Sequence, residues 1–232
     1  METIGHHNGF YLNEDRRLQP KEYFKLLVGL ASEHLNVPEV RILDIGCATG
    51  DFLYYLASLF SRASLSGVDV NPEFVRRAKE VVPSADLFLG DIQAGFAIDD
   101  RYDVVFMSSV HYLFSDFEPW LRNLIHATRR AAYVFGIFNP EDLDVRAVVQ
   151  RPGDTTSSTQ WNLISQKSIS GFLDKLRISH RFINWQLPIE IPRCKQDPIR
   201  SWTIETREGE YLTVNGTQIL HRFAVLEITL GS

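Results

Sequence analysis

The sequence predicts an α/β fold with a parallel β-sheet and helices on both of its faces. Short apolar runs alternate five times with segments of helical periodicity between residues 40 and 138. The runs are continuous, which is typical of strands buried on both faces of a parallel sheet. With 232 residues and no internal repeat or flexible linker, the chain is expected to form one domain.

The helices and strands of this pattern follow one another closely. Apolar side chains at helical spacing predict a first helix over residues 24–31, which ends before Pro38. The sequence then predicts, in order, strand 40–45 ("VRILDI"), helix 52–60, strand 65–70 ("LSGVDV"), helix 72–82, strand 85–91 ("ADLFLGD"), strand 102–109 ("YDVVFMSS"), helix 117–125 and strand 131–138 ("AAYVFGIF"). Asn71 is expected to cap the helix that begins at Pro72.

The pattern becomes less regular after residue 140. "RPGDTTSSTQ" (151–160) is expected to be a polar loop, and Ser165 is expected to cap a helix that runs to residue 176. Residues typical of strands then alternate around two turn pairs, Glu208-Gly209 and Asn215-Gly216, which predicts a hairpin. "FAVLEITL" (223–230) is expected to be the last strand.

Composition excludes several classes of function. The net charge is −5 and no Lys/Arg run forms a basic stripe, so neither nucleic acid nor an anionic membrane is expected as a partner. Two cysteines do not make a disulfide framework, and no metal site is expected. No signal peptide opens the chain and no apolar run reaches about 18 residues, so we expect a cytoplasmic protein.

The turn "GCATG" after the first strand is the strongest candidate for a ligand site. In an open parallel sheet, ligands bind beyond the carboxyl ends of the strands, which is where Gly46 to Gly50 lie. Asp44, Asp69 and Asp91 each stand at the end of one of three consecutive strands. A carboxylate at the end of the second strand can accept hydrogen bonds from both hydroxyls of a ribose. The sequence therefore predicts a nucleoside site.

The glycine spacing argues against two common nucleotide sites. A dinucleotide site needs G-x-G-x-x-G with helix N–H groups aimed at a pyrophosphate. Here the turn reads G-C-A-T-G-D, and Asp51 enters the helix where a phosphate would lie. No P-loop motif occurs. An uncharged or cationic group near the turn fits better than a phosphate.

Four segments in this order, "LDIGCATG", "GVDVNPEFV", "LGDI" and "YDVVFMSSVHYLF", resemble the class I S-adenosylmethionine-dependent methyltransferases. The resemblance covers residues 38–139. It implies a three-layer, Rossmann-like fold with a seven-stranded, mostly parallel sheet whose last strand is antiparallel. The predicted hairpin and "FAVLEIT" would correspond to the last two strands.

The resemblance also implies a set of cofactor contacts. Asp44 and the backbone of Gly46 would hold the methionine part, Asp69 the ribose, and Asp91 with Ile92 the adenine. The remaining expected contacts are Cys47, Ala48, Gly50, Val70 and Ser108. Ala48 departs from the family pattern, since it replaces a central glycine of the turn. S-adenosylmethionine would be the cofactor and S-adenosylhomocysteine its product.

His111 is the candidate catalytic residue. It follows the fourth strand by three residues, near the expected position of the transferred methyl group. It could act as a general base for a hydroxyl acceptor. The alternative is a histidine whose ring packs beside Tyr112.

The least regular segments are expected to form the acceptor pocket. They contain a group of aromatic and polar side chains that could hold a planar or cationic acceptor: Phe10, Tyr11, Trp161, Asn162, Trp185 and Trp202. The N-terminal segment could fold over the cofactor as a lid, with Tyr11 in contact. We therefore divide the single domain into lid and helix (1–37), cofactor core (38–139), acceptor side (140–201) and C-terminal strands (202–232).

The function predicted is transfer of a methyl group to an O or N atom of a small-molecule acceptor. Three alternatives remain at this point. A nucleic-acid or protein methyltransferase is disfavoured, because "SSVHY" replaces the Asn/Asp-Pro-Pro-aromatic motif of DNA amino-methylating enzymes. A second alternative is a non-catalytic module that binds the cofactor, although Asp69 and Asp91 argue against decay of the site. A nicotinamide oxidoreductase is disfavoured by the turn spacing. The acceptor and the oligomeric state are not predicted.

Overall fold

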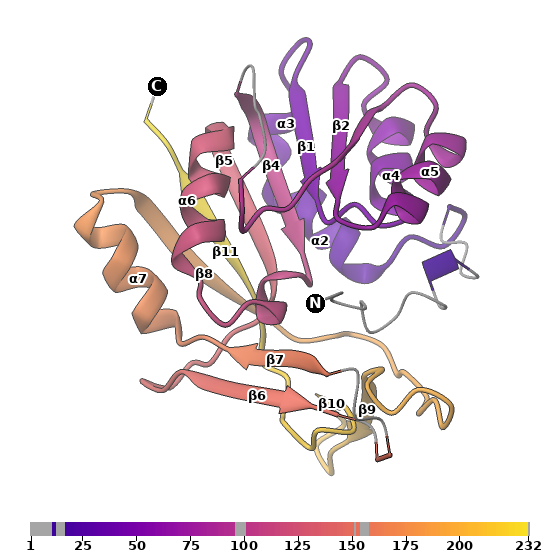
Figure 1. Cartoon of the computed structure of the whole chain (residues 1–232), viewed down its shortest axis with the longest axis vertical. Helices are drawn as coiled ribbons and strands as arrows, with labels where there is room; N and C mark the ends of the chain where they lie inside the picture. The colour runs from indigo at the N-terminus through magenta and orange to yellow at the C-terminus, as the bar shows by residue number, and fades with distance from the viewer. Residues whose placement is uncertain (1–10, 13–16, 96–100, 151, 154–157, 232) are drawn as a thin grey trace.

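A seven-stranded sheet forms the centre of the computed structural model, which describes residues 11–12, 17–95, 101–150, 152–153 and 158–231 (Figure 1). Its strand order is β3-β2-β1-β4-β5-β11-β8. The strands are β1 (Arg41–Ile45), β2 (Ser64–Asp69), β3 (Asp86–Leu89), β4 (Tyr102–Ser108), β5 (Thr128–Ile137), β8 (Ser179–Trp185) and β11 (Phe223–Thr229). Only β11 runs antiparallel to its neighbours, which confirms the predicted fold class.

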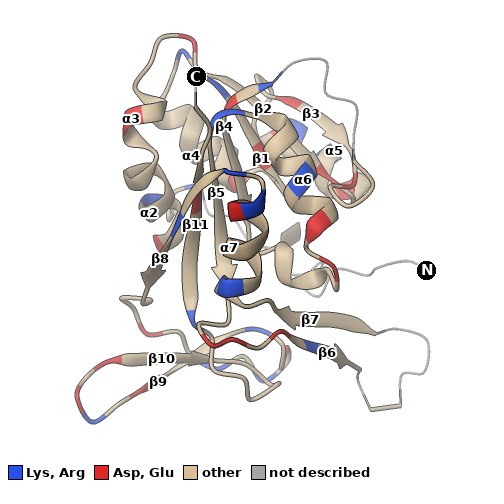
Figure 2. Ribbon diagram, turned by 90° about the vertical axis from the view of Figure 1, so that its left-hand side faces the viewer, with Lys and Arg blue, Asp and Glu red and all other residues tan. Residues whose placement is uncertain are grey.

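Helices cover both faces of this sheet. They are α2 (Glu22–Leu30), α3 (Ser32–Leu35), α4 (Asp51–Leu59), α5 (Pro72–Val81), α6 (Glu118–Ala127) and α7 (Gln166–Lys175). Side chains from α2 to α5 share one buried cluster, and those from α6 and α7 share another. Figure 2 shows α2 and α3 on one side of the sheet and α6 on the other. The predicted caps are present: the Asn71 and Ser165 side chains accept hydrogen bonds from the backbone of α5 and α7.

The register brings three strand ends to one edge of the sheet. Ile45 of β1 pairs with Val68 of β2 and with Met107 of β4. Carboxyl ends of parallel strands lie at the same edge, so the turn after β1, Asp69 and Ser108 are neighbours there. This edge carries the candidate site.

Two small hairpins lie beyond the carboxyl ends of the parallel strands (Figure 1). Strands β6 (Val145–Val149) and β7 (Thr159–Leu163) form one, and β9 (Trp202–Glu205) and β10 (Tyr211–Val214) form the other. A short 3₁₀-helix, η1 (His111–Leu113), packs beside β7. These elements surround the open side of the candidate site.

Two expectations about the second half of the chain are wrong. The predicted hairpin forms β9 and β10, but these two strands pair apart from the main sheet, and β8 is the edge strand beside β11. The segment "SHRFINW" escaped prediction because it opens with three polar residues and shows neither a continuous apolar run nor a strict polar–apolar alternation. The expected loop 151–160 is shorter than predicted, because β7 begins at Thr159.

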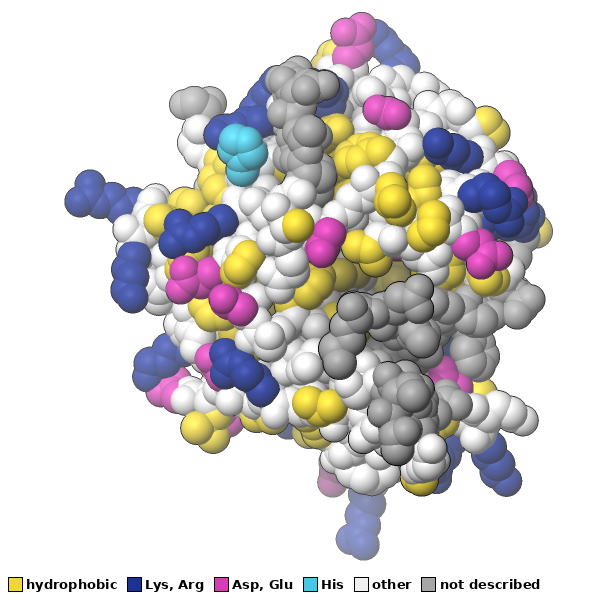
Figure 3. All heavy atoms as spheres, in the orientation of Figure 1, with side chains coloured by type: hydrophobic (Ala, Val, Ile, Leu, Met, Phe, Trp, Pro, Cys, Tyr) yellow, Lys and Arg dark blue, Asp and Glu magenta, His cyan; other side chains and the backbone are white. Residues whose placement is uncertain are grey.

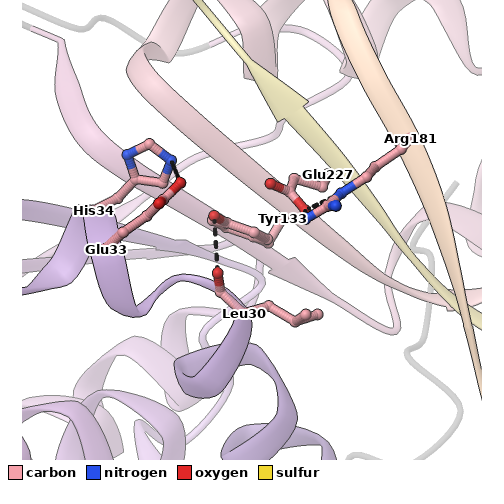
Figure 4. A network of polar contacts seen from close by, with 6 residues as sticks. All are labelled: Leu30, Glu33, His34, Tyr133, Arg181 and Glu227. Atoms are coloured by element: carbon pink, nitrogen blue, oxygen red, sulfur yellow. Dashed lines mark hydrogen bonds and ion pairs between the residues drawn. The ribbon is translucent and has the colours of Figure 1, made fainter.

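A polar network fixes the first helices to the sheet (Figure 4). Glu227 of β11 lies opposite Tyr133 on one side and Arg181 on the other. Arg181 contacts the Glu227 carboxylate at 2.7 Å, and Tyr133 donates a hydrogen bond to the Leu30 carbonyl at 3.4 Å. The N-terminal helix is therefore tied to β5 on the face that it covers.

Within the described ranges, no helix combines the length and the apolar character needed to cross a bilayer.

Candidate functional site

The turn after β1 has a backbone that excludes most side chains. The N–H groups of Gly46 and Cys47 both donate to the Val68 carbonyl, at 2.8 and 3.1 Å. Gly46 has φ +74°, and a Cβ atom there would collide with Val110. Gly50 has φ +87° and lies at the N-cap of α4. Glycine adopts such φ values without strain, and at both positions it lets the turn pack closely, against Val110 at Gly46 and against Ala78 at Gly50.

Asp69 connects this turn to the end of β2. Its Oδ2 accepts a hydrogen bond from the Ala48 N–H at 3.0 Å, and its Oδ1 accepts one from the Asn71 N–H at 2.9 Å. Ala48 itself has φ +45°. The hydrogen bond to Asp69 therefore holds the Ala48 backbone in the left-handed region, although this position carries a methyl group where the family pattern has glycine.

Burial dominates the acid–base properties of the turn. It raises the pKa of Asp44 well above its ordinary value, and repulsion from Asp69 raises it further. Burial also raises the pKa of Asp69, against the hydrogen bonds from Asn71, Ala48 and Val70 that lower it. The pKa of Cys47 is raised by burial and by both carboxylates, so its thiol stays protonated and is a poor nucleophile.

A cleft of about 40 Å³ opens at this turn, and we call it the turn cleft. Asp44 lines it from β1, Gly46 and Ala48 line it from the turn, and Ser108 lines it from β4. The Ser108 Oγ is buried and has no hydrogen-bond partner among the described residues. Such an orphaned polar atom suits a site whose ligand supplies the missing partner.

The residues expected to hold ribose and adenine lie outside the lining of the turn cleft. Asp69 pairs with Leu89 in the sheet, so Asp91 follows on the neighbouring strand end. Asp91 is exposed, and its Oδ1 accepts from the Gln93 N–H at 2.8 Å. Ile92 is buried, and Val70 is 59% exposed. The structure thus brings these groups to one sheet edge, on the β2–β3 side of the turn.

A larger cleft of about 990 Å³ adjoins the turn cleft, and we call it the acceptor cleft. Tyr11, Lys21 and Tyr23 line both clefts. Seven of the residues that line the acceptor cleft are aromatic, and the Tyr23 and Phe135 rings among them stack with centroids 4.6 Å apart. In the space-filling view, hydrophobic side chains gather across the middle of the face, and Lys and Arg project mainly from its periphery (Figure 3).

The expected pocket residues reach this cleft only in part. Tyr11, Trp161 and Trp185 line it. Trp202 does not, but its ring holds the guanidinium of Arg193, a lining residue, at 4.5 Å. Asn162 is fully buried. Phe10 lies outside the described residues.

His111 is a buried residue that lines neither cleft. Its Nε2 lies 3.0 Å from the Ile137 carbonyl, and its ring stacks on Phe138 with centroids 4.3 Å apart. Burial lowers its pKa to about 4. A neutral imidazole in such a position packs well, and this geometry favours the packing role over the role of a base.

A different hydroxyl–imidazole pair borders the acceptor cleft. Ser201 lines the cleft, and its Oγ lies 3.2 Å from Nδ1 of His221. Burial lowers the pKa of His221 to about 4, so this ring is neutral at physiological pH. Sequence reasoning missed the pair because 20 residues separate its members and neither forms a motif.

Lys21, Arg193 and Arg200 also line the acceptor cleft and were not predicted. Their positions depend on how the segments before α2 and before β9 fold back over the sheet edge, which no local pattern encodes. Across the part of the chain that the structure describes, no group of three or more His, Cys, Asp or Glu side chains is arranged to hold a metal ion.

Comparison with known proteins agrees with this architecture. The family described as "Methyltransferase domain" matches residues 42–131. A malonyl-[acyl-carrier protein] O-methyltransferase of Bacillus cereus is 25% identical over 70% of this chain and 62% of its own length. A trans-aconitate 2-methyltransferase of Rhodopseudomonas palustris is 28% identical over 56% of this chain and 48% of its own length. The chain therefore spans less than two thirds of these curated relatives.

A solved structure extends the likeness to the whole fold. An S-adenosylmethionine-dependent methyltransferase from Clostridium acetobutylicum superposes with a TM-score of 0.61 over 97% of this chain and 99% of its own, at 11% identity. At that identity the likeness concerns the fold. Residues 42–131 are therefore similar to the methyltransferase domain, and the whole chain has the fold of the class I, Rossmann-like methyltransferases.

Proposed function

We propose that this protein is an S-adenosylmethionine-dependent methyltransferase that transfers the methyl group to an O or N atom of a small-molecule acceptor. The observation that carries the proposal is the junction of the turn cleft with the aromatic acceptor cleft. Tyr11, Lys21 and Tyr23 line both. A ligand held at the turn would therefore face a second ligand directly.

The residues at the turn fit the cofactor. Gly46 lines the turn cleft, and the buried Ser108 Oγ has no hydrogen-bond partner among the described residues. Asp44 and Gly46 would hold the methionine part, Asp69 the ribose, and Asp91 with Ile92 the adenine. Bound there, the cofactor supplies a methyl group that its sulfonium already activates. The chain then has to align an acceptor and exclude water.

The acceptor cleft offers positioning groups and weak bases. Its aromatic walls and its volume of about 990 Å³ suit a small molecule. Among its described lining residues, Glu22 is paired with Lys25 at 2.6 Å, and Ser201 is backed by a histidine of low pKa. An acceptor that is nucleophilic without deprotonation, such as a carboxylate or a neutral amine, needs no strong base among these groups. One relative is named as a malonyl-[acyl-carrier protein] O-methyltransferase and the other as a trans-aconitate 2-methyltransferase, which supports a carboxylate acceptor.

We further infer that Tyr11 belongs to a lid over the cofactor. Its ring meets Phe74 of α5 edge-on at 5.7 Å, and it lines both clefts. In this proposal Tyr11 would separate the ribose from the acceptor. The rest of the expected lid lies largely outside the described residues.

Binding measurements separate this proposal from its rivals. Calorimetry on the purified chain should give binding of S-adenosylhomocysteine and none of nicotinamide dinucleotides. Radiolabelled methyl transfer should then appear with a panel of small carboxylic acids and amines. Methyl transfer to nucleic acid or protein instead would show that the acceptor is a macromolecule. Binding of S-adenosylhomocysteine without transfer to any acceptor would favour the non-catalytic module.

A further inference from the structure

Lys21 occupies an unusual position between the two clefts. It directly precedes α2, where its carbonyl accepts a hydrogen bond from the Phe24 N–H at 2.9 Å. Its Nζ lies 5.1 Å from the ring centroid of Tyr11, 6.0 Å from that of Tyr23 and 5.9 Å from that of Phe24. An ammonium group among three aromatic rings is directed by cation–π attraction and kept partly away from water.

The charges that line the turn cleft are complementary to an amino acid. Asp44 and Asp51 contribute carboxylates, and Lys21 contributes the only cation among the described lining residues. The amine of a bound amino acid would find its partner at a carboxylate. The carboxylate of the same ligand would find its partner at Lys21.

The N-terminus of α4 is the other place where a ligand carboxylate could bind, because free N–H groups attract anions. Asp51 is the first residue of that helix and lines the turn cleft. Its negative charge repels an anion there. This leaves Lys21 as the better partner.

We propose that Lys21 binds the α-carboxylate of the cofactor's methionine part and selects for cofactors that carry it. The inference rests on the proposed function, since it assumes that an adenosyl-amino acid occupies the turn cleft. It adds a residue and a specificity that the motifs around β1 to β4 do not contain. The aromatic rings fix the ammonium at the junction, where it holds the amino-acid end of the ligand in the turn cleft and away from the acceptor cleft.

The test compares two ligands that differ only in the carboxylate: S-adenosylhomocysteine and its decarboxylated analogue, adenosylthiopropylamine. Lys21→Met keeps the length of the side chain and its contact with the aromatic rings while removing the charge. We expect Lys21→Met to weaken S-adenosylhomocysteine binding by about tenfold or more, as for a lost charged hydrogen bond. Binding of the analogue should change by less than about threefold, well under the tenfold that corresponds to 1.4 kcal/mol.

Two further variants complete the experiment. Lys21→Arg keeps the charge and should retain most of the affinity. Lys79→Met removes an exposed lysine of α5, outside both clefts, and should leave both affinities unchanged. Equal weakening of both ligands by Lys21→Met, or no weakening of either, would overturn the inference while leaving the methyltransferase proposal intact. Failure of the unmodified chain to bind S-adenosylhomocysteine would overturn both.

Discussion

The carboxylate of Asp69 accepts a hydrogen bond from the backbone N–H of Ala48 at 3.0 Å, which joins the end of β2 to the turn after β1. The second oxygen of the same carboxylate accepts from the Asn71 N–H at 2.9 Å. Asp69 is therefore a structural acceptor for two strand ends and also the expected partner of the ribose. Its substitution has to affect both the turn and the ligand.

Asp69→Ala should weaken binding of S-adenosylhomocysteine by more than tenfold. Two charge-assisted hydrogen bonds to the ribose would be lost, each worth about 1.5–3 kcal/mol before water compensates. The Ala48 and Asn71 N–H groups would lose their acceptor as well, so the turn should loosen. Calorimetry measures the affinity, and Asp86→Ala at the exposed start of β3 is the matched control. An affinity within about threefold of the unmodified chain would exclude the ribose role.

Ala48→Gly should stabilise the protein slightly without loss of cofactor affinity. Ala48 has φ +45°, a region that costs an L-residue about 1–2 kcal/mol. Glycine removes this strain, but its greater conformational entropy in the unfolded chain costs about 0.4–1 kcal/mol of stability. The net gain should be about 0.5–1 kcal/mol by denaturant unfolding. The same change at Ala57, inside α4, should destabilise the protein by about 1 kcal/mol. A change in unfolding free energy of the same sign at both positions would contradict backbone strain at Ala48.

Asp44→Asn should stabilise the protein without cofactor at neutral pH and weaken cofactor binding. Burial raises the pKa of Asp44, so ionising it disfavours the folded state. Its folded pKa lies above its unfolded value near 3.9, so stability is highest below that pH and falls as the pH rises through the raised pKa. The asparagine variant should therefore melt higher at neutral pH, by about 2–4 °C per kcal/mol gained, and lose this advantage below about pH 4. A difference in melting temperature between the two proteins that stays the same from neutral pH to about pH 4 would refute the cost of a buried charge at Asp44.

Much of the sheet could be predicted because its strands carry a local signal. The strands β1, β4 and β5 carry apolar runs, and Asn71 and Ser165 are residues that cap helices. The turn glycines and the aspartates at the strand ends follow from the same pattern, because parallel strands place their carboxyl ends at one edge.

The acceptor side could not be predicted in the same way. The edge strand β8 has neither an apolar run nor a polar–apolar alternation, so its membership of the sheet depends on pairing with β11. Ser201 and His221 meet only because the segment before β9 and the segment after β10 fold together. The burial of His111 depends on Gly136, where a Cβ atom would collide with the imidazole. Such contacts are set by tertiary packing, which no short window of sequence contains.

His111→Phe tests the packing role of this histidine most directly. Phenylalanine keeps the ring stacked on Phe138 but removes the donor to the Ile137 carbonyl. We expect S-adenosylhomocysteine affinity to stay nearly unchanged and the unfolding free energy at neutral pH to fall by about 1–3 kcal/mol, since a buried carbonyl loses its partner. If His111 is instead a base, turnover with a found acceptor should fall by about 10² to 10⁴ while stability changes little.

The pH dependence of stability gives a second reading of the same variant. The folded pKa of His111 is about 4, below its ordinary value of 6.5, because burial disfavours the imidazolium. Between these values the unfolded chain takes up a proton that the folded chain does not, so stability is lost as the pH falls from 6.5 towards 4. His111 should contribute a slope of about 1.4 kcal/mol per pH unit. His221 adds a slope of the same sign, while Asp44 and Asp69 oppose it. Subtracting the His111→Phe curve from that of the unmodified chain isolates His111, and parallel curves over this window would mean that its ring is accessible to protons in the folded state.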